Sequence, residues 1–386
     1  ASRVNESTAA NAEKSLFDGI DTTWARFRAI APSRQARASL DSLPAALHAV
    51  RTAYDPFAPE KLTRPLGKLG VVLAGICPVF GQSPCTNPVA GRADLERDLY
   101  ASARAAQERL FAITASASSV AIEVTSLREA VAVGTSVPLI VNVFNRGRDT
   151  AWISNAVVLG SRGSISGTRP LSPGAERHDT IIARVDSIAR PWWLSSGRNG
   201  GMFSSARAIP ENWPDWQNNV YFLVDLGSGA VAPFQTAAVY RVADQTKGEI
   251  QRAVQGVPAI AVTVDQRSQY ALAGSEMSRE LEVHLRSADE SPRDVRVTLS
   301  LPRGLVADSM SRGAHLGGYD AVTTVTFRIR GRLASGDHRI DALAEGGGET
   351  FSSGYDLIDY NHIRRQRVYR PASVTLTAVD VRVPSN

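Results

Sequence analysis

The stretch Arg279-Glu-Leu-Glu-Val-His-Leu-Arg286 alternates polar and apolar side chains without interruption. In an extended chain, one face then carries Leu281, Val283 and Leu285, and the other carries Glu280, Glu282 and His284. One face is suited to a core and the other to water, as is typical of antiparallel sandwich strands. This alternation predicts a β-strand in a two-layered β-domain.

Similar segments lie on both sides of this strand, after a turn at Gly256-Val-Pro258. They predict further strands at Ile260–Val264, Asp294–Leu301, Thr323–Arg330, His338–Ala344 and Val374–Val383. Their number and spacing favour an immunoglobulin-like (Ig-like) sandwich over 255–386.

A second set of short apolar segments precedes that turn. It predicts strands at Val120–Val124, Val137–Phe144, Trp152–Leu159, Ile181–Val185, Val220–Leu226 and Thr236–Val242. Residues 117–254 are therefore expected to form another Ig-like sandwich, and the chain to be mainly β with two sandwiches in tandem.

The first part of the chain has helical periodicity instead. Leu16, Ile20, Trp24 and Phe27 fall on one helix face. Further helices are expected at Ala36–Ala53, after a cap at Ser33, and at Arg92–Ile113. Pro44 predicts a kink or a later start in the first of these. Residues 1–116 thus form a helical linker or bundle ahead of the sandwiches.

Composition limits the function classes. The 386 residues are 43% hydrophobic and 21% charged, with a net charge of +5, which describes a globular protein. No apolar run reaches the ~20 residues of a membrane-spanning helix. The arginines are dispersed rather than gathered in a stripe, which argues against nucleic-acid binding.

Two cysteines, Cys77 and Cys85, lie in a loop rich in proline and glycine. A disulfide suits this spacing and indicates an oxidising compartment. A redox-active pair is the alternative, although such pairs are usually separated by two residues. With no further ligand nearby, a zinc site is not expected.

No catalytic motif is recognisable. The six histidines form no short metal-binding pair, and neither a nucleophile elbow nor a phosphate-binding loop is present. We therefore expect no catalytic residue, no metal site and no cofactor in this chain. The densest acid–histidine group is Asp356, Asp359 and His362. It is either a metal or proton-relay site or, as we favour, a polar connection. There Tyr355, Ile358, Tyr360 and Ile363 pack inward and the acids pair with Arg364 or Arg367.

The glycines Gly346-Gly-Gly348 are flanked by Asp337, Glu345 and Glu349. This arrangement predicts a hairpin tip, with a calcium site as the alternative.

The best candidates for ligand recognition are aromatic. Trp192, Trp193, Trp213 and Trp216 lie in one long irregular insertion. Exposed tryptophans can stack on sugars, and long loops are often functional. The alternative is that these rings are buried against another part of the protein.

Three segments carry a resemblance to a known family. They are Gly354–Pro371, Ser15–Trp24, and Val239–Glu249 with Pro258–Val264 behind it. They resemble the non-catalytic C-terminal region of long exported bacterial proteins of the PIG-L/LmbE family. Leu139–Gly147 resembles the NEW3 type of Ig-like module.

This resemblance implies a zinc-dependent sugar N-deacetylase domain upstream, with the zinc bound there. The expected function is a non-catalytic accessory region that supports or targets that domain, outside the cytoplasm, secreted or periplasmic. The alternative is a free-standing glycan-binding or adhesion protein. The expected partners are the upstream domain and a glycan or cell-wall polysaccharide, but neither nucleic acid nor a membrane span. Whether the parent protein is an enzyme depends on that domain.

Overall fold

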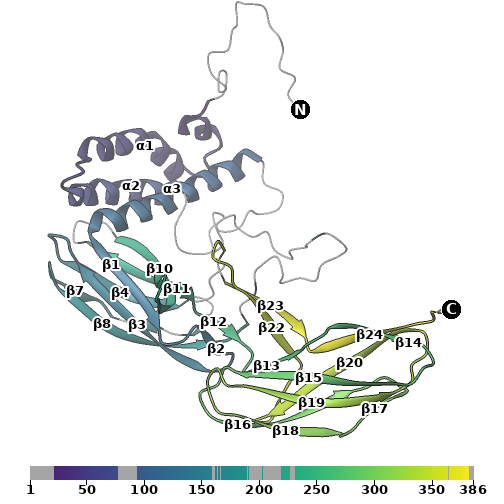
Figure 1. Ribbon diagram of the computed structural model, residues 1–386. Coiled ribbons are helices and arrows are strands. Elements are labelled where there is room, and N and C mark those ends of the chain that lie inside the picture. The colour runs from purple at the N-terminus through teal and green to yellow at the C-terminus, as the bar shows by residue number, and fades with distance from the viewer. Residues whose placement is uncertain are drawn as a thin grey trace, which may run out of the picture.

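The computed structural model describes residues 21–76, 94–158, 161–162, 164–165, 167–188, 190, 202, 219–226, 231–363 and 365–381. The protein is mainly β, with a helical N-terminal segment followed by two tandem Ig-like β-sandwiches (Figure 1). This agrees with the fold class predicted from the sequence.

The helical segment contains 3₁₀ turns and α-helices. They are η2 (Trp24–Ile30), α1 (Arg34–Ala53), η3 (Pro59–Leu62), α2 (Thr63–Ile76) and α3 (Asp94–Ser118). The Ser33 hydroxyl accepts a hydrogen bond from the Ala36 amide at 3.0 Å, so the predicted cap is confirmed. Helix α1 continues through Pro44, so the alternative of a later start is wrong.

Helix α2 was not predicted, because Gly70 and Gly75 interrupt its apolar sequence. A Cβ at Gly75 would lie 2.2 Å from the Ser39 hydroxyl of α1, so this glycine lets the two helices approach closely. None of the helices in the described residues combines the length and the apolar character that crossing a membrane requires.

The first sandwich is built around one strand that belongs to both layers. One layer contains β5 (Ser161–Arg162), β8 (Glu176–Val185), β3 (Ser136–Asn145), β1 (Val120–Ser126) and β11 (Gly248–Ala253). The other contains β9 (Asn219–Asp225), β4 (Ala151–Val158), β6 (Ser164–Ile165) and β7 (Arg169–Leu171). Strand β10 (Val231–Asp244) pairs with β9 through its first half and with β1 and β11 through its second.

The second sandwich has two separate sheets. The four-stranded sheet has the order β13 (Ile260–Val264), β15 (Met277–Ser287), β19 (Val322–Gly331), β17 (Leu305–Ala307). The six-stranded sheet contains β14 (Ser268–Leu272), β24 (Ser373–Val379), β20 (Gly336–Gly346), β16 (Arg293–Ser300), β18 (Ser311–Leu316) and β21 (Glu349–Phe351). Leu281, Val283 and Leu285 are buried between the sheets, as their alternation predicted.

Two small ladders lie between the sandwiches (Figure 1). One is the parallel pair of β2 (Ala130–Ala132) and β12 (Gln255–Val257). The other is the hairpin of β22 (Ser353–Ile358) and β23 (Gln366–Pro371), which extends from the second sandwich toward the first. Together they form what we call the junction.

Candidate functional site

The junction begins with backbone contacts and a small apolar cluster. The Gln255 amide donates to the Glu129 carbonyl at 2.8 Å, which holds β12 beside β2. The cluster consists of Ala130, Ala132, Val257, Ala259 and Ala288, with Phe351 and Tyr355 packed against it. Most of these side chains are small, so the two sandwiches approach each other closely here.

At the centre of the junction, one buried carboxylate receives three arginines. Arg367 Nη2 donates to Glu129 Oε1 at 2.7 Å, and Arg365 Nη1 donates to Glu129 Oε2 at 2.8 Å. Arg252 Nη1 reaches the same Oε2 at 3.4 Å. Glu129 and Arg252 belong to the first sandwich and the other two arginines to the hairpin. The cluster therefore joins the two sandwiches by charge-assisted hydrogen bonds.

The charge of the buried Arg367 is stabilised by the charge of Glu129. Glu129 is 8% exposed and Arg367 is 6% exposed. Burial by itself lowers the pKa of Arg367, but the charge of Glu129 and the hydrogen bonds to it raise that pKa overall. A second guanidinium nitrogen of Arg367 donates to the side-chain oxygen of Gln255. Both buried charges are therefore paired within the junction, as buried charges in proteins usually are.

Tyrosines close the junction on the hairpin side. The rings of Tyr355 and Tyr369 meet edge to face, with 5.6 Å between their centroids. The Tyr369 hydroxyl donates to the Gly256 carbonyl at 3.2 Å, and Arg190 lies over the same ring. Burial raises the pKa of Tyr369. The ring thus stays neutral and fixes the hairpin to β12.

The role of this cluster is structural: its ion pairs connect the two sandwiches. Both oxygens of Glu129 accept hydrogen bonds from arginines that lie on the other sandwich. The cluster is a site of domain–domain recognition within the chain.

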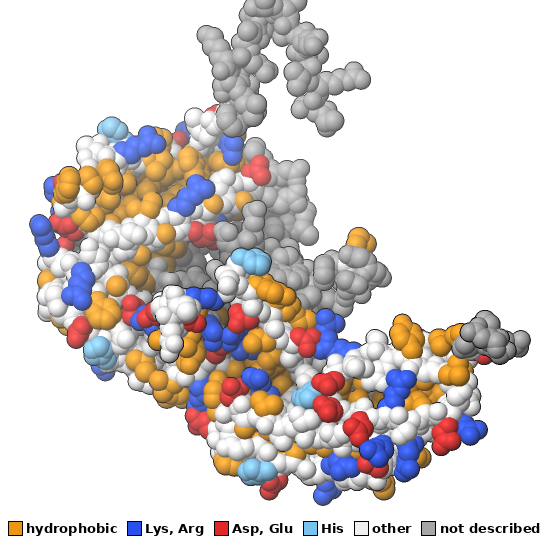
Figure 2. All heavy atoms as spheres, in the orientation of Figure 1, with side chains coloured by type: hydrophobic (Ala, Val, Ile, Leu, Met, Phe, Trp, Pro, Cys, Tyr) orange, Lys and Arg blue, Asp and Glu red, His pale blue; other side chains and the backbone are white. Residues whose placement is uncertain are grey.

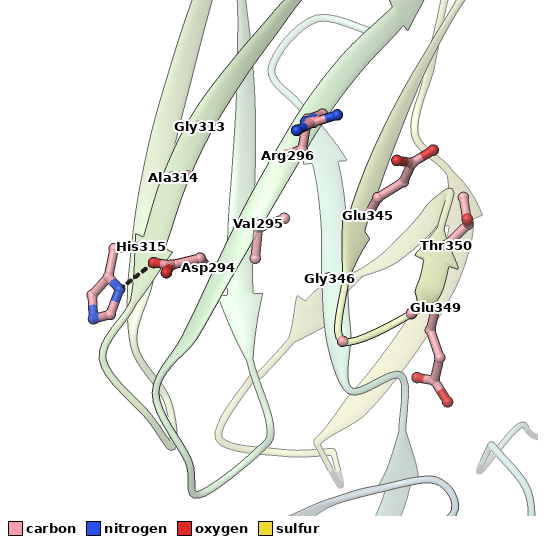
Figure 3. A pocket seen from close by; sticks show the side chains of 12 residues that line it. Asp294, Val295, Arg296, Gly313, Ala314, His315, Glu345, Gly346, Glu349 and Thr350 are labelled. Carbon is pink, nitrogen blue, oxygen red and sulfur yellow. Dashed lines mark hydrogen bonds and ion pairs between the residues drawn. The ribbon is translucent and has the colours of Figure 1, made fainter.

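A second feature is an open hollow of about 830 Å³ in the second sandwich (Figure 3). Asp294, Arg296, His315 and Glu345 to Thr350 are among the residues that line it. His315 Nδ1 lies 2.7 Å from Asp294 Oδ1, while the side chains of Glu345 and Glu349 point apart.

The glycines beside the hollow form the hairpin turn that the sequence predicted, with positive φ at Gly347 and Gly348. Asp337, the third acid of the calcium alternative, accepts a hydrogen bond from the Thr377 hydroxyl instead. The three acids do not meet, so the calcium alternative has no support here.

Among the described residues, the acid–histidine group near the C-terminus does not converge on one point either. Asp356 pairs with Arg267 at 2.5 Å, Asp359 pairs with Arg365, and His362 stacks on Tyr360. Both acids thus pair with arginines, as the favoured polar connection expects. The predicted pairing with Arg367 is wrong, because Arg367 pairs with Glu129, and Arg364 lies outside the described residues. Tyr360 and Ile363 are 62% and 44% exposed, so their predicted inward packing is also wrong.

The other candidates lie outside the described residues. These are Cys77 and Cys85 of the expected disulfide, and Trp192, Trp193, Trp213 and Trp216 of the expected glycan surface.

Comparisons with known proteins give similarity of fold only. No family model matches the chain, and no curated protein matches it. Among solved structures, red sea bream transglutaminase is 10% identical, with 76% of this chain and 34% of that chain covered and a TM-score of 0.29. The chain thus spans about a third of that protein.

Two further structures are similar over a smaller part of this chain. The PapD-like domain 7 of human CEP192 is 11% identical over 31% of this chain and 87% of its own, with a TM-score of 0.19. WR4, a member of the MSP family from C. elegans, is also 11% identical, over 31% of this chain and 97% of its own, with the same TM-score of 0.19. Scores this low say nothing about function.

Proposed function

We propose that this chain is a rigid, non-catalytic accessory region that supports a catalytic domain of the PIG-L/LmbE N-deacetylase type outside the cytoplasm. The observation that carries the supporting role is the buried cluster of Glu129 with Arg252, Arg365 and Arg367. It ties the two sandwiches together by contacts that a mobile linker lacks. The deacetylase in the proposal comes from the sequence resemblance.

The helical segment supports the proposal as the place of attachment. Helix α3 continues into β1 through a single residue, Ser119, whose carbonyl accepts from the Arg146 amide at 2.9 Å. A direct connection of this kind transmits orientation from the helices to the first sandwich. Figure 2 shows hydrophobic side chains gathered over this helical segment, and Phe57 and Val71 there are 94% and 72% exposed. A preceding domain can cover such a surface.

Figure 2 also shows how charged side chains are distributed, which matters for a nucleic-acid partner. On the face that Figure 2 shows, basic and acidic side chains are interspersed over the second sandwich. This pattern does not favour a nucleic-acid partner. Glycan binding by the four tryptophans stays a prediction.

The test is the mass of the native protein. An antibody against the second sandwich is used on extracts of the source cells, and the captured protein is analysed by peptide mass spectrometry. We expect a band well above the 41.4 kDa of this chain, with peptides from an upstream domain that carries a His-Pro-Asp-Asp-type motif. A native protein of about this chain's own mass would refute the proposal.

A further inference from the structure

Three possible metal ligands meet on the outer face of the four-stranded sheet. Glu282 and His284 are two positions apart on the central strand β15, so their side chains share one face. Asp265 directly follows β13, whose last residue, Val264, pairs with Val283 between them. Pairing across strands thus brings all three ligands to one point on a rigid sheet.

The ligand atoms are close together. His284 Nε2 lies 2.5 Å from Asp265 Oδ1 and 4.0 Å from Glu282 Oε2. One donor atom from each of the three residues lies within 4.8 Å of the other two. In the described part of the chain, no other set of three His, Cys, Asp or Glu residues converges in this way.

The other imidazole nitrogen is held by a fourth residue. His284 Nδ1 lies 2.9 Å from the hydroxyl of Thr324, its cross-strand partner on β19. At 2.5 Å from Asp265, Nε2 shares a proton with that carboxylate. If a metal ion replaces this proton, Nδ1–H can donate to the Thr324 hydroxyl, and the Nε2 lone pair is then directed at the metal. Metal-binding histidines are usually oriented by such a hydrogen bond to their second nitrogen.

The two carboxylates also lack an arginine partner. Within the described residues, His284 is the one basic side chain within 4.0 Å of Asp265 or Glu282. Their neighbours differ, since Glu280 pairs with Arg328 at 2.8 Å and Asp320 pairs with Arg286 at 2.9 Å. Two carboxylates face a single imidazole, so at least one negative charge is left for another cation to balance.

We propose that Asp265, Glu282 and His284 form a binding site for a divalent transition metal, for which Zn²⁺ is the probe. One imidazole nitrogen and two carboxylate oxygens are ligands that zinc accepts, and water completes the coordination. Tetrahedral coordination needs ligand atoms roughly 3.3 Å apart, so Asp265 must move back from His284. Its side chain is 55% exposed and follows the end of a strand, which gives it room to do so.

This site is separate from the zinc expected in an upstream catalytic domain and does not depend on the proposed function. It revises the expectation from the sequence that this chain holds no metal. The sequence signal was the Glu-x-His spacing on a strand, but nothing in the sequence showed that Asp265 completes the set.

Calorimetric titration of the tag-free chain with ZnSO₄ tests the site. We expect one Zn²⁺ per chain in the parent, and loss of that binding in His284→Ala and in Glu282→Gln. His315→Ala is the matched control, since His315 is also an exposed strand histidine paired with one aspartate, and it should bind as the parent does. Thermal unfolding of each variant checks that it is folded.

A second variant tests the orienting role of Thr324. Replacement by the isosteric Val removes the hydroxyl and leaves all three ligands in place, so Zn²⁺ should bind roughly tenfold more weakly. No Zn²⁺ binding by the parent, or equal binding by the parent and by folded His284→Ala, would overturn the proposal.

Discussion

Glu129 is the residue on which the junction depends, because its carboxylate is the partner of a nearly inaccessible arginine. In Glu129→Gln the neutral amide leaves Arg367 buried without a counter-charge. We expect the free energy of unfolding to fall by about 3 kcal/mol, measured by urea denaturation of the folded chain.

Glu280→Gln is the control for this variant. Glu280 and Arg328 are 2.8 Å apart, about as close as Glu129 and Arg367, but both side chains are 58% exposed. Water replaces most of such an interaction, so its loss should not be resolved from the parent. Equal effects of the two variants would show that burial of the junction does not matter.

Because of Tyr369, we expect the protein to become less stable at high pH. Burial raises its pKa above the ordinary tyrosine value of 10.0. Above about pH 10 the unfolded chain loses this proton while the folded chain keeps it, so the free energy of unfolding falls as pH rises. In Tyr369→Phe this decline should be less steep, as measured by the urea midpoint between about pH 9 and 12. Parallel declines in parent and variant would contradict this role of Tyr369.

At the scale of elements, β12 fits closely against the chain that follows β8. A Cβ at Gly256 would lie 2.1 Å from the Ser187 carbonyl oxygen, which is backbone and cannot rotate away. We therefore expect Gly256→Ala to lower the free energy of unfolding by about 1–3 kcal/mol.

Gly313→Ala in β18 is the matched control, since a Cβ there meets no heavy atom within 4 Å. It should leave stability unchanged or raise it by up to about 1 kcal/mol. If Gly256→Ala is as stable as this control, β12 does not pack closely against the Ser187 carbonyl.

The elements also show what a single sequence can predict. Long alternating segments, such as Arg279–Arg286, identified the main strands, because a strand with one buried face has a period of two. Two- or three-residue strands such as β2 and β12 are too short to show a period. Helix α2 was missed because its glycines look like helix breakers, although one of them, Gly75, allows close packing against α1.

The junction could not be predicted for a different reason. Glu129 and Arg367 are 238 positions apart, and no local pattern links them. From the sequence, the arginines of the hairpin are expected to pair with the acids nearest to them along the chain. Only the folded arrangement of both sandwiches brings Glu129 to them.

At the scale of the whole molecule, we infer that the sandwiches keep one relative orientation. A buried ion cluster, an apolar cluster and a backbone ladder all lie at the same place between them. Separate sandwiches on a flexible connection would share none of these. A supporting region needs this rigidity if it is to present another domain at a fixed distance.

The most direct test is a distance distribution between the sandwiches. Spin labels are placed at Thr180→Cys on β8 and Ser300→Cys on β16, both exposed, with Cys77 and Cys85 replaced by serine. Double electron–electron resonance should give one narrow distribution, which broadens in Glu129→Gln and not in Glu280→Gln. A broad distribution in the otherwise unaltered chain would contradict the account.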